Sequence, residues 1–265
     1  MTGNVAGKTV WITGASGGLG EALAHAFGAA GARLVLSARR EAELERVAAA
    51  VADAGGTARA VPMDLADSGS IAAAAAGVAR VEGRIDVLVH NAGQTQRALI
   101  ADAGIDVYRR LFEVNFFGPL ALTKAALPAM EGGGRIVVVS SIAAYYSSPY
   151  RSGYNASKKA LHGLFDALRA EAHRDGIGVL LVVLGSVRTK VSINALRGDG
   201  SFYGRMDPAM AAGMDPGAVA RKIVRATVAG REEITAAPLR QRWLMWRKAW
   251  FPRLASRAVR LRPRG

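Results

Sequence analysis

A tyrosine and a lysine four residues apart, Tyr154 and Lys158, are the pair in this chain best suited to moving a proton. In a helix, side chains at this spacing lie on one face, one turn apart. The pKa of a free tyrosine is about 10, and a nearby ammonium group lowers it by favouring the phenolate. The pair is therefore suited to protonating an alkoxide or deprotonating an alcohol. Tyr145, Tyr146 and Tyr150 lie nearby, but none has a lysine four residues further on, so these three are expected to wall the substrate site.

A glycine-rich loop near the N-terminus is a candidate site for the phosphates of a dinucleotide. The apolar run 9–13 leads directly into the loop, and a helical pattern follows from about residue 18. The glycines of the loop are Gly14, Gly17, Gly18 and Gly20. A strand, a glycine loop and a helix together present backbone N–H groups and a helix N-terminus to a pyrophosphate. The spacing is not that of the ordinary G-x-G-x-x-G fingerprint, and a simple tight turn is the alternative interpretation.

Taken together, these residues resemble the short-chain dehydrogenase/reductase family. The glycine motif of that family, T-G-x-x-x-G-x-G, is met by Thr13, Gly14, Gly18 and Gly20. Its N-N-A-G motif appears as His90-Asn91-Ala92-Gly93, with histidine in place of the first asparagine. The motifs keep the order and spacing of the family from about residue 7 to residue 236.

The resemblance implies that a hydride passes between a nicotinamide and a carbonyl carbon, with four residues acting at the reacting oxygen. Tyr154 would donate the proton, and Ser141, thirteen residues before it, would hydrogen-bond the oxygen. Lys158 would lower the pKa of the tyrosine and hold the nicotinamide ribose. Asn115 matches the helix asparagine of the family, which orders a relay water beside the lysine. These four are the predicted catalytic residues.

The end of the second predicted strand, 33–37, indicates which nucleotide binds. Ala38 stands where NAD-binding folds place an acidic residue for the ribose 2′-hydroxyl, and Arg39 and Arg40 follow it. Guanidinium groups can bind a 2′-phosphate that a carboxylate would repel. We therefore expect NADP(H) to be preferred by about one to two decades, with NAD(H) as the alternative cofactor. Another interpretation is that glutamates 41, 43 and 45 pair with these arginines.

By the resemblance, the cofactor contacts are spread over several distant segments. They are Gly14, Ser16, Gly17, Gly18, Leu19, Gly20, Arg39, Arg40, Asp64, Leu65, Asn91, Ala92, Gly93, Tyr154, Lys158, Val187 and Thr189. The segment 184–189 departs from the P-G-x-V-x-T pattern of the family, because Leu184 replaces the proline. Proline fixes the backbone dihedral φ, so we expect a less rigid turn here.

The rest of the chain predicts one doubly wound α/β domain of about seven parallel strands, residues 1–236, with helices on both faces. Strands are expected near 9–13, 33–37, 58–63, 85–89, 135–139, 178–184 and 232–236. Helices are expected near 18–30, 40–54, 68–82, 103–130, 153–174 and 216–229. The 265 residues include no cysteine, which excludes disulfides and thiolate chemistry. The four histidines lack the spacing of metal ligands, so no metal site is expected.

The segment 190–214 is the predicted substrate lid, rich in glycine. Its apolar residues are Phe202, Tyr203, Met206, Met210 and Met214, which either line the substrate site or pack the lid onto the core. The lid and the Ala-Arg-Arg run are similar to membrane-associated reductases of the 11β-hydroxysteroid-dehydrogenase-like branch, which implies a bulky lipophilic carbonyl or alcohol. The alternatives are a 3-oxoacyl-[acyl carrier protein] reductase and a non-catalytic NADP-binding scaffold or sensor.

The C-terminal extension, 237–265, is basic and rich in tryptophan. Residues 231–265 hold ten Lys or Arg against two Glu, within a chain of net charge +14. Trp243, Trp246 and Trp250 share one helical face with Leu239, and Pro252 is expected to end that helix. The sequence favours a peripheral membrane contact or a second subunit of a homodimer or homotetramer over nucleic acid. With neither a membrane span nor a signal peptide in the sequence, we expect a cytoplasmic protein, peripheral membrane contact being the alternative location.

Overall fold

The computed structural model describes residues 4–258 and residue 260. Within them lies one parallel sheet of seven strands in the order β3-β2-β1-β4-β5-β6-β7, which confirms the predicted fold class. The strands are β1 (Thr9–Thr13), β2 (Arg33–Ser37), β3 (Thr57–Ala60), β4 (Val87–His90), β5 (Gly134–Ser141), β6 (Ile177–Leu184) and β7 (Glu233–Ala236). The order reverses between β1 and β4, at the switch point where ligands bind in open parallel sheets.

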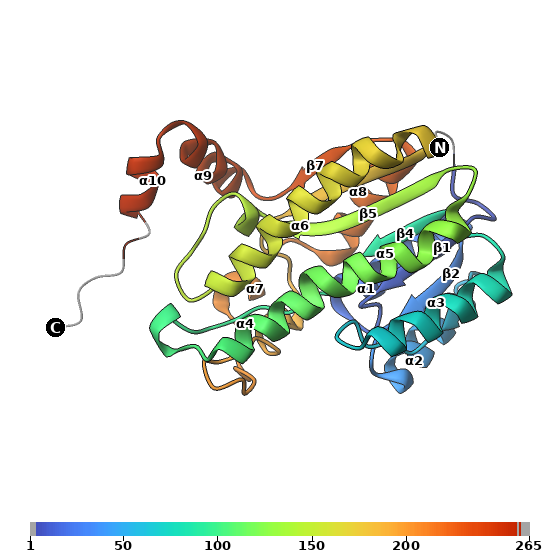
Figure 1. The fold of residues 1–265 in the computed structure, drawn as a ribbon, viewed down its shortest axis with the longest axis horizontal. Helices are drawn as coiled ribbons and strands as arrows, with labels where there is room; N and C mark the ends of the chain where they lie inside the picture. Colours follow the sequence, from blue (N-terminus) through green and yellow to red (C-terminus); the bar gives the residue numbers. More distant parts are fainter. Residues whose placement is uncertain (1–3, 259, 261–265) are drawn as a thin grey trace.

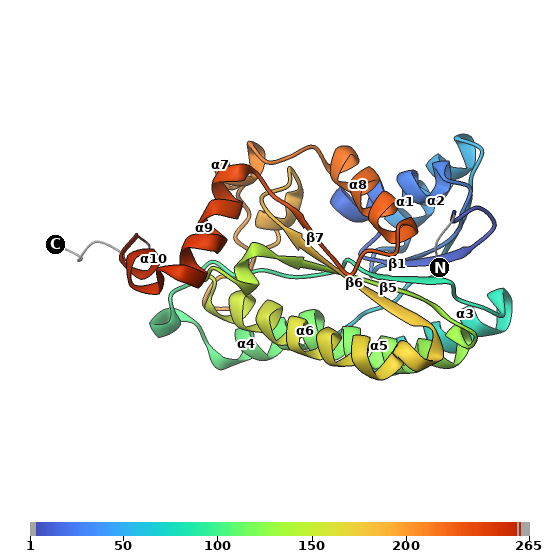
Figure 2. The same cartoon turned by 90° about the horizontal axis from the view of Figure 1, so that it is seen from above.

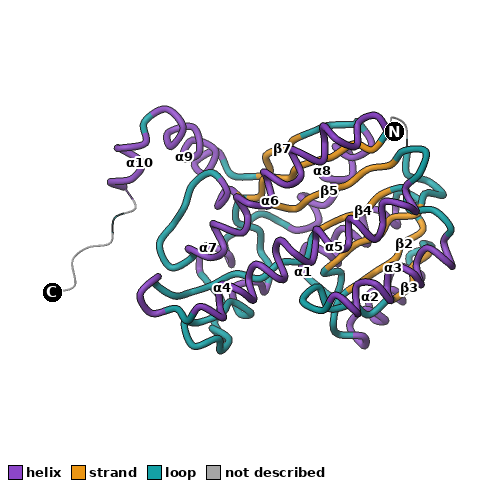
Figure 3. Tube along the Cα trace, in the orientation of Figure 1, coloured by secondary structure: helices purple, strands orange, loops and turns teal. Residues whose placement is uncertain are grey.

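Helices cover both faces of the sheet (Figures 1 and 2). One layer holds α1 (Gly18–Ala29), α2 (Glu41–Asp53) and α8 (Pro216–Val228). The other holds α3 (Ser68–Glu82), α4 (Ile105–Phe112), α5 (Gly118–Ala126) and α6 (Ser152–Glu171). Beyond the carboxyl end of the strands lie α7 (Pro208–Ala211), α9 (Leu239–Trp250) and α10 (Pro252–Ala258). Figure 3 shows the long loops that gather at this same end.

Two apolar cores, one on each face of the sheet, explain why the strands read as continuous apolar runs. In β1 the side chains of Val10 and Ile12 belong to the core beneath α1, α2 and α8. Trp11 points to the opposite core, beneath α3, α5 and α6, and is fully buried. Its indole Nε1 donates a hydrogen bond to Ser37 Oγ at 2.8 Å, so the buried polar atom is satisfied.

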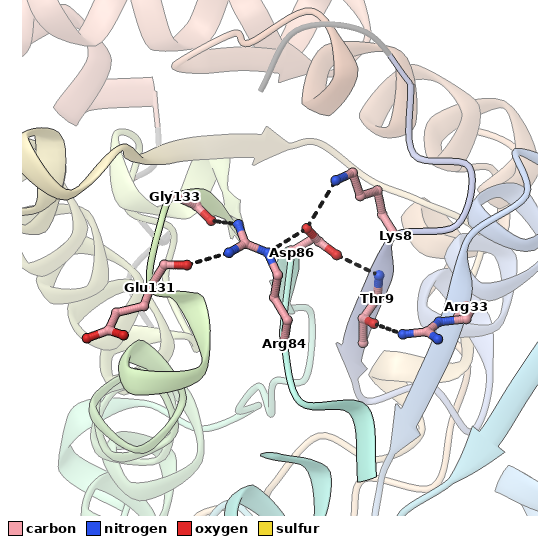
Figure 4. Close-up of polar contacts among 7 residues, drawn as sticks. All are labelled: Lys8, Thr9, Arg33, Arg84, Asp86, Glu131 and Gly133. Carbon is pink, nitrogen blue, oxygen red and sulfur yellow. Dashed lines mark hydrogen bonds and ion pairs between the residues drawn. The ribbon is translucent and has the colours of Figure 1, made fainter. Parts of the chain in front are cut away.

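A cluster of polar residues joins the strands at the opposite, amino end of the sheet (Figure 4). The carboxylate of Asp86 accepts hydrogen bonds from Thr9 N at 3.0 Å and Arg84 Nε at 3.1 Å, and it pairs with Lys8 Nζ at 3.5 Å. Burial acts to raise the pKa of Asp86, but these bonds and charges hold it below its usual value. Arg84 continues to the carbonyls of Glu131 and Gly133, so the cluster links β1, β4 and the start of β5.

The long helix predicted over 103–130 is interrupted, which corrects the sequence-based assignment. A turn of π-helix, η2 (Glu113–Phe117), separates α4 from α5, and a 3₁₀ turn, η3 (Leu127–Met130), ends the segment. Asn115 lies within η2, and its amide bonds to the backbone of Gln94 outside the helix. A polar side chain that bonds backbone in this way competes with the helical ladder, and π turns often mark functional sites.

Candidate active site

The predicted proton donor and its serine partner meet at the carboxyl end of the sheet. Ser141 is the last residue of β5, and Tyr154 is the third residue of α6, half-buried beside it. Burial raises the pKa of Tyr154, although its hydrogen bond with Ser141 and the charge of Arg151 act in the opposite direction. The phenol is therefore protonated near neutral pH. The sequence predicted a pKa lowered by the lysine, whereas burial is the largest influence on this phenol.

Lys158 and Asn115 converge on the loop that follows β4. Lys158 is 4 % exposed, and its Nζ donates to the carbonyl oxygen of Val139 at 2.9 Å. Burial lowers the pKa of Lys158 to about 8. A Cβ placed on Gly93 would lie 3.3 Å from Asn115 Oδ1 and 3.5 Å from Lys158 Nζ, so all three residues are neighbours. The Asn115 amide is held in place, since it also donates to Ser157 Oγ at 3.0 Å.

His90, which departs from the N-N-A-G motif, is buried and neutral. Its Nε2 lies 2.8 Å from the hydroxyl of Thr123, which itself donates to the carbonyl oxygen of Pro119 at 2.7 Å. The Thr123 oxygen therefore accepts a hydrogen bond from His90 Nε2–H. Burial lowers the pKa of His90 to about 3, with a smaller contribution from the charge of Lys158. The histidine thus fills the position of the asparagine without adding charge beside the lysine.

The glycine loop is shaped by close backbone approaches that side chains would prevent. A Cβ on Gly14 would lie 2.8 Å from Ala92 Cα, and one on Gly20 would lie 2.1 Å from Gly14 O. The side chain of Asn91 holds the loop from the other side, donating to Thr13 O at 3.0 Å and Gly14 O at 3.3 Å. The loop therefore opens into α1 at the switch point of the sheet, where it could hold a pyrophosphate.

The arginines that follow β2 are free of the neighbouring glutamates that the sequence offered as partners. Glu43 pairs instead with Arg46, whose Nη1 also binds Glu21 Oε1 at 2.7 Å. In the described part of the chain, no ion pair joins Arg39 or Arg40 to an acid, and both are exposed. Arg40 Nη2 lies 3.4 Å from Ser16 Oγ of the glycine loop, so it stands next to the predicted phosphate site.

Asp64 and Leu65, two of the predicted cofactor contacts, lie in the turn between β3 and α3. Asp64 Oδ1 accepts a hydrogen bond from Ala66 N at 3.0 Å, and Asp64 N donates to Ser70 Oγ at 3.0 Å. Leu65 is buried, and its carbonyl lies so close to Gly118 that a Cβ there would be 2.4 Å away. These bonds fix the turn, whereas the roles of Asp64 and Leu65 toward a nucleotide stay predictions.

The turn after β6 faces the glycine loop across the predicted cofactor site. A Cβ on Gly18 would lie 3.3 Å from Thr189 Cβ, and Val187, the other predicted contact, is buried.

A residue that the sequence analysis missed holds this turn from the C-terminal extension. Gln241 of α9 accepts a hydrogen bond from Ser186 N at 3.1 Å and donates to Ser186 Oγ at 3.1 Å. The one signal in the sequence was Leu184, which replaces the proline of the family pattern and so predicted a less rigid turn.

Replacing Gln241 with leucine is expected to loosen this turn and weaken cofactor binding about 5- to 100-fold, because the partly buried Ser186 N–H loses its acceptor. Arg242→Leu is the control, since Arg242 is exposed on the same helix and, among the described residues, its side chain makes no hydrogen bond to the turn. Titration of each variant with NADPH, followed by fluorescence, measures the dissociation constant. Equal affinities in the two variants would show that the turn is rigid without Gln241.

The lid is fastened to the body of the domain by an acidic residue. Asp207, which caps α7, pairs with Arg97 and, at 3.5 Å, with Arg151. Two of the predicted lining residues, Phe202 and Met206, are exposed. Met214 instead packs against the core beneath α8, and it is paired with Val187 by a β-bridge. For Met214 the structure therefore favours the packing interpretation.

The tyrosines near Tyr154 do not all face the lid. Tyr145 Oη donates to Glu233 Oε2 at 3.2 Å, and its ring packs edge-on against His162 at 5.2 Å. This places Tyr145 against β7 and α6, which corrects the expectation that it lines the substrate site. Tyr150 instead borders a cavity of about 390 Å³ between the loop after β4 and the lid, together with Tyr203.

Comparison with known proteins decides the family. Residues 8–199 match the family described as short chain dehydrogenase. The chain belongs to the short-chain dehydrogenase/reductase family. It is 43 % identical over 253 residues to the dehydrogenase/reductase SDR family protein 7-like of Anopheles gambiae, covering 93 % of this chain and 80 % of the relative. It is 40 % identical over 269 residues to the dehydrogenase/reductase SDR family member 7B of Danio rerio, covering 98 % and 87 %.

Solved structures agree with this short-chain dehydrogenase/reductase assignment. A short-chain dehydrogenase from Streptomyces avermitilis superposes with a TM-score of 0.81 at 32 % identity, covering 95 % of each chain. A metagenomic short-chain oxidoreductase in complex with NADP superposes with a TM-score of 0.75 at 31 % identity, covering 88 % of this chain and 98 % of its own. The protein is thus an oxidoreductase of a family that binds NAD(P), acts on small molecules and often forms oligomers.

Two further observations concern metals and membranes. Within residues 4–258, no three His, Asp or Glu side chains gather in a group that could hold a metal ion. None of the helices in that range combines the length and hydropathy needed to cross a bilayer.

Proposed function

We propose that the protein is an NADP(H)-dependent oxidoreductase that interconverts a carbonyl and an alcohol on a lipophilic substrate, with Tyr154 as the acid and base. The observation that carries the proposal is the meeting of four residues at the carboxyl end of the sheet. Ser141 ends β5 beside Tyr154 at the start of α6, and Lys158 and Asn115 meet at Gly93. A scaffold that only binds nucleotide has no need of this buried set of proton-transfer groups.

In carbonyl reduction, each of the four residues would have its own role. The protonated phenol of Tyr154 gives its proton to the carbonyl oxygen of the substrate as negative charge develops there. Ser141 Oγ hydrogen-bonds the same oxygen and orients it. Lys158, held at Val139 O, would supply a mostly protonated amine one helical turn from the tyrosine. The amide of Asn115, fixed by its bond to Ser157, lies on the same side of Gly93 as that amine. The bound nicotinamide supplies or accepts the hydride.

The residues that would hold the cofactor fit a dinucleotide. The glycine loop and the N-terminus of α1 are open to the pyrophosphate, and Thr189 lies across from Gly18. Ser16 and Arg40 stand together at the end of β2, where a 2′-phosphate would lie. Both arginines are unpaired with acids among the described residues, which supports a preference for NADP(H) over NAD(H).

The double variant Arg39→Ala/Arg40→Ala is expected to raise the KM for NADPH about 10- to 100-fold and to leave the KM for NADH nearly unchanged, because only the phosphate contacts are lost. Steady-state kinetics with each cofactor measure the two constants. Arg46→Ala is the control, because Arg46 is bound to Glu21 and Glu43. An equal loss with both cofactors would contradict a role in selecting the 2′-phosphate.

The proposed substrate class rests on the lid. Phe202 and Met206 present exposed apolar surface there. Tyr150 and Tyr203 border an open hollow that is also lined by charged residues, among them Arg97, Arg197 and Asp199, so the apolar contribution comes from the lid residues and the two rings. These apolar groups suit a lipophilic ketone, aldehyde or alcohol. We further propose that the protein forms a homodimer or homotetramer, as members of the family often do.

The test is consumption of NADPH and NADH with a panel of lipophilic ketones and aldehydes and an acetoacetyl thioester, using Tyr154→Phe as the blank. Turnover above the blank with a lipophilic carbonyl and NADPH is the expected result. Preference for the thioester would favour a 3-oxoacyl reductase instead. Tight NADPH binding with no turnover above the blank would favour a nucleotide-binding scaffold.

A further inference from the structure

The C-terminal helix α9 has one face anchored on the domain and one face free. Its inner side is fixed by the two hydrogen bonds between Gln241 and Ser186, and it packs against η4 (Ile142–Ala144), the turn that follows Ser141. Leu244 and Met245, on this inner side, are partly buried. The helix is therefore held firmly at the carboxyl end of the sheet, where the candidate active site lies (Figure 2).

The outer face of α9 is apolar and exposed. It consists of Leu239, Trp243, Trp246 and Trp250, which are 79 %, 52 %, 52 % and 70 % exposed. Phe251 and Leu254, 48 % and 51 % exposed, continue this surface into α10, and the ring of Phe251 packs edge-on against Trp246 at 5.8 Å. Three exposed indoles on one helix face form an apolar patch of the kind that binds a membrane or another molecule.

Positive charge surrounds the outer face, and the sequence from residue 234 to residue 260 contributes no acid to balance it. Arg240 and Arg242 line an open hollow together with Leu239, Trp243 and Trp246. Arg247 lies over the ring of Trp243, 5.2 Å from its centroid. Residues 234–260 contain seven Lys or Arg and neither Asp nor Glu. The partner that complements this surface is therefore apolar and anionic at once.

We propose that the outer face of α9 docks on an anionic lipid surface. Tryptophan side chains favour the boundary between headgroups and acyl chains, and arginines attract anionic lipids at the same depth. A second copy of this chain fits less well, since an isologous contact would bring two copies of the same basic face together. Docking through the outer face of α9 would hold η4 and Ser186 about 10 Å from the bilayer, on the far side of the helix. Given the proposed function, a lipophilic substrate would then have a short path from the membrane to the active site.

The test is sedimentation of the full chain with vesicles of phosphatidylcholine alone or of phosphatidylcholine and phosphatidylglycerol in equal amounts. Binding to the anionic vesicles is expected to exceed binding to the neutral ones by about tenfold or more. Tryptophan emission should shift to the blue on binding, because three of the four tryptophans lie on the outer face and Trp11 is already buried. Neither substrate nor cofactor is present, so the result is independent of the proposed reductase activity.

Two variants separate the contributions of indole and charge. Trp243→Ser/Trp246→Ser/Trp250→Ser is expected to lower binding about tenfold or more, whereas Val81→Ser, an exposed apolar residue of α3, should leave it unchanged. Arg240→Glu/Arg242→Glu is expected to lower binding to anionic vesicles by a similar factor. Arg174→Glu/Arg225→Glu makes the same change in net charge at exposed positions elsewhere and should have a small effect.

Three outcomes would overturn the proposal. Absence of binding to anionic vesicles would do so directly. Binding that persists in the triple tryptophan variant would show general charge attraction without docking of the outer face. An oligomer that becomes monomeric in that variant, measured by light scattering, together with no vesicle binding, would assign the face to a subunit interface.

Discussion

Replacing Tyr154 with phenylalanine is expected to lower kcat for carbonyl reduction by about 100- to 10,000-fold, the usual contribution of a general acid. The variant loses only the hydroxyl that hydrogen-bonds Ser141, so the ring still fills its half-buried position at the start of α6. The affinity for NADPH should change little. Steady-state turnover and a fluorescence titration with NADPH measure the two quantities separately.

Tyr145→Phe is the matched control for this prediction. It removes a hydroxyl only nine residues away, but that hydroxyl is bonded to Glu233, so turnover should be retained. The pH profile gives a second readout. Because burial raises the pKa of Tyr154, reduction has its proton donor throughout the neutral range, whereas alcohol oxidation, which needs the phenolate, should rise as the pH increases. Turnover by Tyr154→Phe within tenfold of the parent would contradict the assigned role.

Gly20→Ala is expected to destabilise the domain by about 1–3 kcal/mol and to weaken NADPH binding at least about tenfold. The added methyl would lie 2.1 Å from Gly14 O and 2.7 Å from Asn91 Nδ2, and neither the backbone oxygen nor the bonded amide can move freely. The N-terminus of α1 would have to shift away from the glycine loop. Denaturant unfolding measures the free energy, and titration with NADPH measures the affinity.

Gly77→Ala provides the control, because Gly77 lies within α3 and a Cβ there meets no atom within 4 Å. This variant should be as stable as the parent or more stable by up to about 1 kcal/mol, since alanine favours the helix. Its affinity for NADPH should be unchanged. If Gly20→Ala kept the unfolding free energy and the NADPH affinity of Gly77→Ala, the close contact between α1 and the glycine loop would not constrain the residue at position 20.

Most of the secondary structure could be predicted because it depends on local patterns. The strands β1 and β2 begin and end at the predicted residues, and α3 matches its predicted range. The family could also be recognised, since the glycine loop and the Tyr154–Lys158 pair keep fixed spacings along the chain. The break in the helix over 103–130 was not predicted, since it depends on the bonds of Asn115 to Gln94, 21 residues away.

The sequence by itself determined the alternation of strands and helices, the family, and the set of residues proposed to do the chemistry. Only the tertiary structure decided how these residues are tuned and supported. It showed that burial raises the pKa of Tyr154, that His90 is neutral, and that Gln241 holds a turn 55 residues earlier in the chain. The reason is that helical and strand periodicity arises between near neighbours. Desolvation and long-range hydrogen bonds arise only when distant segments pack together.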